Sequence, residues 1–306
     1  MVSLAQIDYI LALLEYRNFQ KASEACFVTQ PTLSMQVKKA EEILGNNLIN
    51  RDTNPLSLTT FGQEIIPYLL KIKEEYESLR VSVEKYSGIY KAEIRLGIIP
   101  TIAGYMVPEM YAQWQQELGE IRFEIIELKT EQILQALETK KIDLGIMAGP
   151  LNNSRFRDQI LFNEEILIYA PHVKGQLISE EDLNKEKPWL LSQGNCLRTQ
   201  MINFCNLNES QKDEWNYEGG SLHILINMVK QQGGYTLVPA NYVPHLNLSS
   251  DHFKSLTGHT PIRQVIGVHS ERNSKREYLN RLMRVIQSAQ PKRKISSENT
   301  SLLPWT

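Results

Sequence analysis

The sequence has few cysteines, no long apolar run and almost no net charge. Three cysteines in 306 residues exclude a disulfide-stapled scaffold and favour a reducing, cytoplasmic environment. No apolar run approaches the roughly 18 residues of a membrane span, and Asp8, Glu15 and Arg17 in the first turns argue against a secretory signal. With 33 basic against 35 acidic residues, the net charge of −2 provides no polybasic signal for nucleic acid or membrane.

Motifs typical of metal, nucleotide and hydrolase chemistry are also missing. The sequence contains no HExxH, P-loop or GxGxxG motif, and its 6 histidines lack metal-ligand spacing. No Ser-His-Asp arrangement follows from spacing either. We therefore predict no metal and no cofactor, which leaves the cysteines as the candidates for chemistry.

What is present begins with short helices and strands in residues 1–60. Hydrophobic residues make up 42% of the chain and charged residues 22%, which predicts a folded protein of about two domains. Two short helices joined by residues 26–28 form a candidate helix-turn-helix unit. Thr29 is a candidate N-cap of the second helix, Pro31 fits its first turn and Gly45 ends it. Residues 48–51 and 56–59 are expected to be two short strands.

The second helix of this unit is the candidate DNA reader, because such a helix enters the major groove. The side chains suited to bases or phosphates are Gln30, Thr32, Ser34, Gln36 and Lys38, with Lys21, Lys39 and Arg51 as further phosphate contacts. Residues 1–60 hold five basic and six acidic residues, a net charge of −1. Since a DNA-binding domain is usually basic, an ordinary small helical domain is the alternative.

Residues 61–90 predict one long helix with a narrow apolar stripe. The stripe follows heptad spacing at Ile65, Leu69, Ile72, Tyr76, Leu79, Val83 and Tyr86. We expect this helix to pair with a second copy of the chain, and packing within its own domain is the alternative.

Residues 91–290 alternate between predicted strands and predicted helices. This pattern is typical of a parallel sheet with helices on its faces, here in two α/β lobes with ligand space between them. The expected fold class is therefore a multi-domain α+β protein. Residues 291–306 are polar, contain the cluster Lys292-Arg293-Lys294 and are expected to be disordered.

Two of the cysteines lie close together in the sequence. On one continuous helix, the Cα atoms of Cys196 and Cys205 would lie about 13.5 Å apart, whereas a disulfide needs about 7 Å or less. An intact helix and a disulfide therefore exclude each other, as in a redox switch. Cys196 is expected at the helix start with Arg198 nearby, and both features lower a thiol pKa. The alternative is two unrelated core cysteines, and Cys26 is expected to be a small buried hydrophobe.

The N-terminal residues resemble those of the LysR-type transcriptional regulators. The resemblance is carried by Asn18-Phe19, Ala22-Ser23, residues 28–34, Glu41-Glu42-x-Leu44-Gly45-x-x-Leu48 with Arg51, and Leu58-Thr59-x-x-Gly62. It implies a winged helix-turn-helix, a dimerising linker helix and a two-lobed effector domain like that of periplasmic binding proteins. It also implies operator contacts by Gln30, Pro31, Thr32, Ser34, Gln36, Lys38 and Arg51.

Residues 194–205 resemble the peroxide-sensing segment of the OxyR branch of that family. They read Gly-x-Cys-Leu-Arg-x-Gln-x-x-x-Phe-Cys. The resemblance implies that Cys196 is the peroxidatic cysteine and Cys205 the resolving one. It implies a peroxide pocket of Thr101, Thr130, Asn195, Arg198 and Arg263.

Some of these positions have alternative roles or depart from the branch. Helix N-capping is the alternative role for Thr101 and Thr130. Asn195 and Thr199 stand where the branch usually has a histidine and an acid, and Gln264 competes with Arg263 for the arginine position. The response to peroxide is therefore expected to be tuned differently.

We expect a cytoplasmic, DNA-binding transcription factor that is not an enzyme and that responds to hydrogen peroxide. It is expected to be a homo-oligomer, as a dimer of dimers. The other expected partners are promoter operator DNA, RNA polymerase, and thiol reductants such as glutaredoxin or thioredoxin. The alternatives are a LysR-type regulator controlled by a small molecule between the lobes, and a thiol peroxidase fused to a DNA-binding unit.

Overall fold

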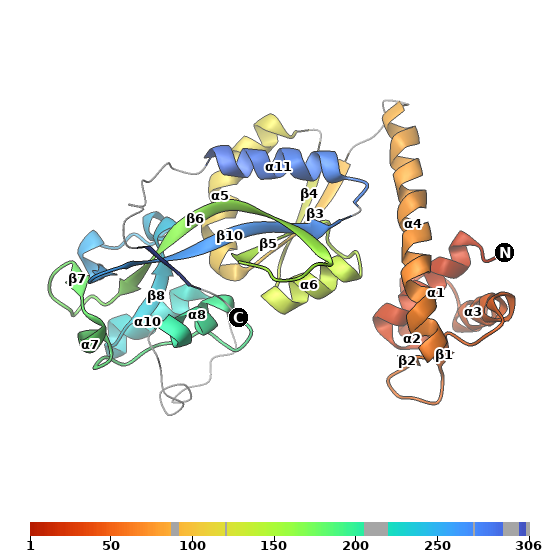
Figure 1. Cartoon of the computed structure of the whole chain (residues 1–306), viewed down its shortest axis with the longest axis horizontal. Helices are drawn as coiled ribbons and strands as arrows, with labels where there is room; N and C mark the ends of the chain where they lie inside the picture. The colour runs from red at the N-terminus through yellow and green to blue at the C-terminus, as the bar shows by residue number, and fades with distance from the viewer. Residues whose placement is uncertain (87–91, 120, 205–219, 272, 290–299, 304–306) are drawn as a thin grey trace. The chain divides into compact units, whose positions relative to one another are not determined.

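The computed structural model divides the chain into two compact units, Met1–Tyr90 and Lys91–Thr306. It describes residues 1–86, 92–119, 121–204, 220–271, 273–289 and 300–303, without the side chains of residues 84 and 85. Figure 1 shows a helical first unit and an α/β second unit, and each is described by itself. Within the described ranges, none of the helices has the length and apolar character needed to cross a membrane.

The first unit consists of helices and a two-stranded wing. Its elements are α1 (Leu4–Tyr16), α2 (Phe19–Ala25), α3 (Gln30–Leu44), β1 (Ile49–Asn50), β2 (Ser57–Leu58) and α4 (Thr60–Tyr86). The Thr29 side chain caps α3, Pro31 lies in the first turn, and Gly45 ends the helix with a φ of 79°. These positions confirm the predicted bounds of the helix, because they satisfy or spare its terminal backbone groups.

Helix α3 is joined to the wing through one buried carboxylate. Glu41 Oε1 accepts hydrogen bonds from the backbone N–H groups of Leu48 and Ile49, at 2.8 and 3.1 Å. Its Oε2 accepts from Arg51 Nη2 at 2.8 Å. Charge-assisted hydrogen bonds of this kind are strong, so they fix the start of the wing against α3. The surrounding core of this unit includes Ile7, Ile10, Leu13, Leu33 and Val37.

Helix α4 carries an apolar stripe that is buried near its start and exposed further along. Leu69, at the start of the stripe, is buried in the core of the first unit. The later stripe residues Ile72, Tyr76, Leu79, Val83 and Tyr86 are all exposed. Packing within the domain therefore accounts only for the first part of the stripe.

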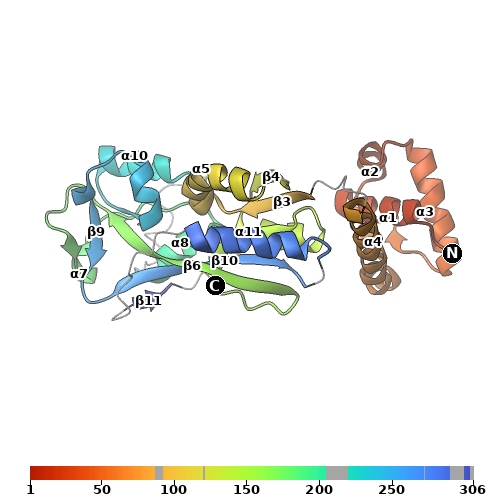
Figure 2. The ribbon, with the colours of Figure 1, turned by 90° about the horizontal axis from the view of Figure 1, so that it is seen from above.

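The second unit is built on a nine-stranded sheet. The strands are β3 (Ala92–Ile98), β4 (Ile121–Glu127), β5 (Leu144–Gly149), β6 (Phe156–Tyr169), β7 (Leu177–Ile178), β8 (Thr236–Pro239), β9 (Phe253–Leu256), β10 (Thr260–Ser270) and β11 (Thr300–Leu302). Their order is β4-β3-β5-β10-β6-β9-β7, with β11 beside β10 and β8 beside β6. Strand β6 pairs with β10 and then, from Ile166, with β8, so it runs through both lobes (Figure 2).

The predicted parallel sheet is only partly correct. Strand β3 is parallel to β4 and β5, but β10 is antiparallel to both β5 and β6. The chain leaves the first lobe along β6, forms the second lobe and returns along β10. The return strand therefore runs in the opposite direction, which the alternation of strands and helices does not reveal.

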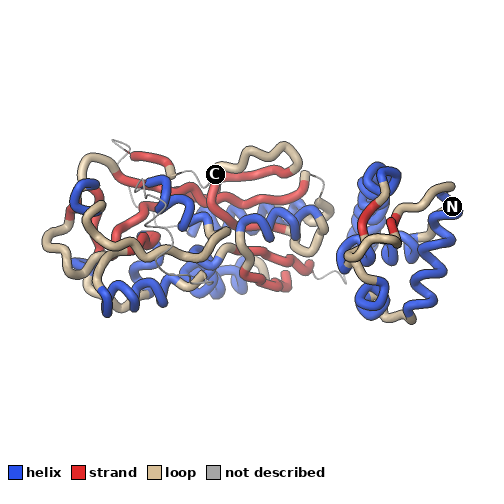
Figure 3. Tube along the Cα trace, turned by 90° about the horizontal axis from the view of Figure 1, so that it is seen from below, coloured by secondary structure: helices blue, strands red, loops and turns tan. Residues whose placement is uncertain are grey.

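Helices cover the sheet, as Figure 3 shows. The first lobe has α5 (Pro100–Glu117), α6 (Thr130–Glu138) and α11 (Arg276–Ala289), and the second has α7 (Glu180–Leu183), α8 (Cys196–Phe204), α10 (Leu222–Gln232) and the 3-10 turns η1 (Ala240–His245) and η2 (Ser250–His252). A Cβ atom on Gly145 would lie 2.4 Å from Ile133 of α6, and one on Gly267 would lie 2.8 Å from Met283 of α11. The two glycines let these helices approach opposite faces of the sheet closely.

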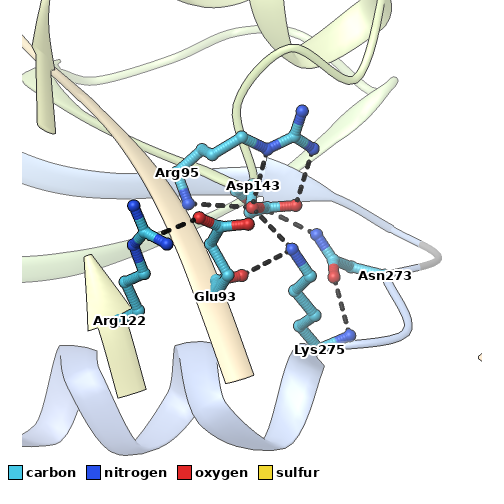
Figure 4. A network of polar contacts seen from close by, with 6 residues as sticks. All are labelled: Glu93, Arg95, Arg122, Asp143, Asn273 and Lys275. Carbon is cyan, nitrogen blue, oxygen red and sulfur yellow. Dashed lines mark hydrogen bonds and ion pairs between the residues drawn. The ribbon is translucent and has the colours of Figure 1, made fainter. Parts of the chain in front are cut away.

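A polar network fastens the end of the first lobe at which β3 begins (Figure 4). The Asp143 carboxylate accepts from the backbone and side chain of Arg95 and from Lys275 Nζ, the latter at 2.9 Å. Lys275 Nζ also donates to the Glu93 backbone oxygen at 2.6 Å, and Asn273 Nδ2 donates to the Asp143 backbone oxygen. The network therefore joins β3, the start of β5 and the loop before α11.

The prediction that residues 291–306 are disordered is wrong for part of this segment. Residues 300–302 form β11, which pairs in parallel with β10. Leu303 is 4% exposed and belongs to the apolar core of the second lobe. Its backbone oxygen accepts from Gln200 Nε2 of α8 at 2.9 Å. A composition average misses the short apolar run Leu302-Leu303, and the basic cluster at 292–294 lies outside the described residues.

We predict that Leu303→Ala lowers the free energy of unfolding by about 2–5 kcal/mol, because it leaves a cavity in the core. Leu302→Ala is the matched control, since Leu302 is 42% exposed, and is expected to cost less than about 1 kcal/mol. Urea unfolding of the full chain measures both values. Equal losses for the two variants would contradict the docking of this segment.

Candidate functional site

Cys196 is buried at the start of a short helix. It is the first residue of α8 and is 4% exposed. The backbone oxygen of Asn195 accepts from the Arg198 N–H at 3.0 Å, while Asn195 Nδ2 donates to Ser192 Oγ at 2.8 Å. Asn195 is thus held by the loop before α8, and the predicted position of Cys196 at a helix start is confirmed.

The two predicted threonines lie at the starts of helices in the first lobe. Thr101 is the second residue of α5 and Thr130 the first residue of α6, and both are buried. The N-cap positions belong to Ile99 and Lys129. The alternative role of Thr101 and Thr130 as N-caps is therefore wrong.

Thr130 brings a hydroxyl to the Cys196 thiol. The Thr130 side chain lowers the pKa of this thiol, because it favours the ionised form. The Thr130 hydroxyl is buried and has no hydrogen-bond partner in the described part of the chain. It is therefore able to donate and accept further hydrogen bonds.

Arg263 supplies a buried cation to the same site. Its Nη1 donates to Thr101 Oγ1 at 2.9 Å, and its Nη2 donates to the Thr101 backbone oxygen at 3.1 Å. Its Nε donates to Glu164 Oε1 at 2.5 Å, and Tyr105 Oη donates to Glu164 Oε2 at 2.9 Å. Gln264, the other candidate for this position, is the next residue of β10 and so faces the opposite side of the sheet.

The expected low pKa of the Cys196 thiol is wrong. Burial raises this pKa above its ordinary value, because desolvation disfavours the thiolate. Arg263, the Leu197 backbone N–H and Thr130 lower the pKa without cancelling that effect, and Glu164 raises it further. The cation that lowers the pKa of Cys196 is Arg263 rather than the expected Arg198. Arg198 Nη1 instead donates to the Leu191 backbone oxygen at 3.0 Å.

The other two cysteines differ in what the structure says of them. Cys205 lies outside the described residues. Cys26 is half-buried and packs against the core of the first unit, in line with its predicted role as a small hydrophobe. Burial raises the pKa of the Cys26 thiol, and Asp8 and Glu15 add to this effect. Across the described segments, no group of three His, Cys, Asp or Glu side chains is placed to hold a metal ion.

The predicted DNA-contacting residues differ in how free their side chains are. Gln30, Pro31, Lys38 and Lys39 are exposed on α3, and Lys21 is exposed on α2. Thr32, Ser34 and Gln36 are half-buried, with Thr32 bonded to Thr29 and Gln36 accepting from Gln6 Nε2 at 3.1 Å. The Arg51 guanidinium is paired with Glu41 and lies 5.7 Å from the centre of the Phe19 ring.

Sequence reasoning missed three residues that the structure brings forward. Glu164 and Tyr105 join Arg263 only through strand pairing and helix packing, so no local motif could have revealed them. Phe27 is 96% exposed in the turn between α2 and α3, with a φ of 55°. Its place in the predicted helix-turn-helix turn was the one available signal.

The chain matches known families over most of its length. Residues 4–63 match the bacterial regulatory helix-turn-helix protein of the lysR family, and residues 88–291 match the LysR substrate binding domain. The DNA-binding transcriptional dual regulator OxyR of Escherichia coli K12 is 30% identical over 247 residues. This alignment covers 79% of the chain and 81% of that protein.

Solved structures show the same fold. Full-length OxyR of Pseudomonas aeruginosa, with a cysteine replaced by aspartate, has a TM-score of 0.73 at 24% identity and covers 94% of both chains. A cysteine-to-serine variant of Corynebacterium glutamicum OxyR with bound hydrogen peroxide has a TM-score of 0.60 at 24% identity, covering 94% of this chain and 92% of that one. With its helix-turn-helix, its long helix α4 and its α/β substrate-binding domain, the chain belongs to the LysR-type transcriptional regulators, which are DNA-binding proteins and not enzymes.

Proposed function

We propose that this regulator senses hydrogen peroxide by reversible formation of a disulfide between Cys196 and Cys205. The observation that carries the proposal is the buried thiol of Cys196, whose pKa the unpartnered hydroxyl of Thr130 lowers. Thr101, held by Arg263, adds a second hydroxyl. Because Thr101 Oγ1 accepts from Arg263, its own proton is the one that can be donated to a peroxide oxygen.

The chemistry requires a thiolate and two cysteines. The Cys196 sulfur attacks one oxygen of hydrogen peroxide, an S–O bond forms, the O–O bond breaks, and the leaving hydroxide takes up a proton to become water. The Cys205 thiolate then attacks the sulfenic sulfur and expels a second hydroxide, which is also protonated. Two thiols and one peroxide thus give one disulfide and two waters.

Formation of this disulfide requires α8 to unwind. The nine residues of α8 separate its first and last Cα atoms, those of Cys196 and Phe204, by about 12 Å. The next residue in the sequence can lie at most about 3.8 Å from Phe204, whereas a disulfide needs Cα atoms within about 7 Å. The folded helix and the disulfide are therefore incompatible, which makes α8 a two-state element.

The output is a change in transcription. The exposed stripe of α4 supports pairing of two copies of the chain, and two such pairs would give the proposed dimer of dimers. Unwinding of α8 would shift contacts between effector domains and reposition the DNA-binding units on the operator, with RNA polymerase as the responding partner. Thiol reductants of the cytoplasm, such as glutaredoxin or thioredoxin, would reset the disulfide by exchange.

A second candidate is a LysR-type regulator controlled by a small molecule bound between the lobes. The raised pKa of the Cys196 thiol favours it, because a protonated thiol reacts slowly with peroxide. In that case Cys196→Ser would leave the response to the effector unchanged.

We predict that peroxide links Cys196 to Cys205 and leaves Cys26 free. Reduced protein is treated with one equivalent of hydrogen peroxide, quenched with an alkylating reagent and mapped by mass spectrometry without reductant. The crosslink is expected in the wild-type chain and in the Cys26→Ser control, and is expected to be absent from Cys196→Ser. If Cys196 and Cys205 both stay alkylatable after a large excess of peroxide, the sensing proposal is contradicted.

The rate of Cys196 oxidation is expected to rise steeply with pH. The thiol pKa is raised, so the reactive thiolate is the minor form at neutral pH, and its fraction grows about tenfold per pH unit below the pKa. Quenched-flow alkylation between about pH 6 and 8 measures the loss of free Cys196 after peroxide addition. A rate that stays constant over this range would show that the thiol is already ionised.

The DNA-contacting face predicts two kinds of effect. Lys38→Ala is expected to weaken binding to all sequences and to reduce the salt slope by about 1, as for one lost phosphate contact. Gln30→Ala is expected to cost about 1–3 kcal/mol on the preferred site and to relax its sequence. Fluorescence anisotropy with a duplex selected from a random pool measures both.

Lys71→Ala, an exposed lysine on α4, is the control for Lys38→Ala. An effect of Lys71→Ala equal to that of Lys38→Ala would argue against α3 as the reader.

A further inference from the structure

A buried ion pair, Arg263 with Glu164, acts electrostatically on the Cys196 thiol, and only its arginine takes part in the chemistry described so far. Arg263 and Glu164 are directly opposite residues on β10 and β6. Both side chains are 0% exposed. One Glu164 oxygen accepts from Arg263 Nε and the other from Tyr105 Oη. Neither oxygen is left without a donor, as a buried carboxylate requires.

The pair fixes the direction in which Arg263 presents its other donors. A guanidinium is planar and rigid, so the bond from Nε to Glu164 determines where Nη1 and Nη2 lie. Both of these nitrogens donate to Thr101, one to its hydroxyl and one to its backbone oxygen. The orientation of the Thr101 hydroxyl in the site thus depends on Glu164 through Arg263.

The pair also acts on the thiol by charge. Arg263 lowers the pKa of Cys196 and Glu164 raises it, and the effect of Arg263 is the larger. Both charges are buried away from water, and buried charges are screened least. The Leu197 N–H and Thr130 also act on this thiol, and neither of them carries a charge.

We propose that Glu164, held by Tyr105, is a positioning residue for the reaction of Cys196. It directs Arg263 toward Thr101, and it limits how strongly the guanidinium favours the thiolate. The consequence for peroxide sensing rests on the function proposed above. The effect on the thiol does not, because any thiol reagent reports it.

The test compares Glu164→Gln with the control Glu165→Gln in the full chain. Glu165 is the next residue of β6, so its side chain faces the other side of the sheet, where it accepts from Ser255. Iodoacetamide labelling of Cys196 is followed by mass spectrometry across pH, without peroxide. The readout is the pH at which the labelling rate reaches half of its maximum. A change in how often the buried site opens to the reagent alters the maximum rate but not this midpoint.

Glu164→Gln is expected to move this midpoint to lower pH. The labelling rate at pH 7, divided by the maximum rate of the same variant, is expected to rise at least about fivefold in Glu164→Gln and to change less than about twofold in Glu165→Gln. The double variant Glu164→Gln with Arg263→Gln is expected to move the midpoint above that of the wild type. Both charges are lost, and the lowering of the thiol pKa by Arg263 is larger than its raising by Glu164. The double variant leaves no unpaired buried charge, so it serves if Glu164→Gln fails to fold.

The outcomes separate this inference from the proposed function. If the midpoints of Glu164→Gln and the double variant equal that of the wild type while peroxide still oxidises Cys196, the inference is overturned and the sensor stands. If the single variant does not fold, the double variant is compared with Arg263→Gln: equal midpoints overturn the effect of Glu164, and a lower midpoint in the double variant supports it. If the midpoints move as stated but peroxide does not oxidise wild-type Cys196, the sensor fails and Glu164 keeps its effect on the thiol.

Discussion

A fully buried positive charge needs a counter-charge, and this requirement organises the centre of the second unit. Arg263 meets it with Glu164, directly across the β6–β10 pair. Removing either partner alone would leave a buried charge uncompensated, at a cost of about 3–5 kcal/mol. These two strands also join the two lobes, so the ion pair and the connection between lobes depend on the same register. Thr101, Tyr105 and Cys196 are arranged around it.

The buried thiol balances protection against reactivity. Desolvation keeps Cys196 in the protonated form, and the nearby cation and hydroxyl partly offset this effect. A thiol of this kind reacts less readily with incidental electrophiles than an exposed thiolate does. For the proposed sensor, the hydroxyls of Thr101 and Thr130 would then select a small hydrogen-bonding oxidant. The incompatibility between an intact α8 and a disulfide would convert one oxidation into a large local change.

The first unit binds DNA without a basic surface. The five basic residues among positions 1–60 include Arg51, whose charge is directed to Glu41 within the wing. Few lysines are left for phosphate contacts, so nonspecific attraction by a single copy is weak. Two copies joined along the exposed stripe of α4 would place two reading helices on one duplex. Such pairing would supply affinity that the composition of one copy does not.

The elements decided by near neighbours could be predicted from the sequence. Thr29, Pro31 and Gly45 set the bounds of α3, heptad spacing marked the stripe of α4, and Cys196 was expected at a helix start. Each depends on backbone groups or side chains within a few residues, and such interactions follow from local sequence.

The remaining features were decided by the tertiary structure, because they depend on register and burial between distant segments. The pairing of Glu164 with Arg263 needs the antiparallel return of β10, and the raised pKa of Cys196 needs the lobes packed around it. The docking of Leu303 beside α8 likewise joins residues about one hundred positions apart. The sequence by itself thus determined the family, the helices and the candidate cysteine. The fold alone decided which charges surround that cysteine, since desolvation and partner geometry exist only once the chain is packed.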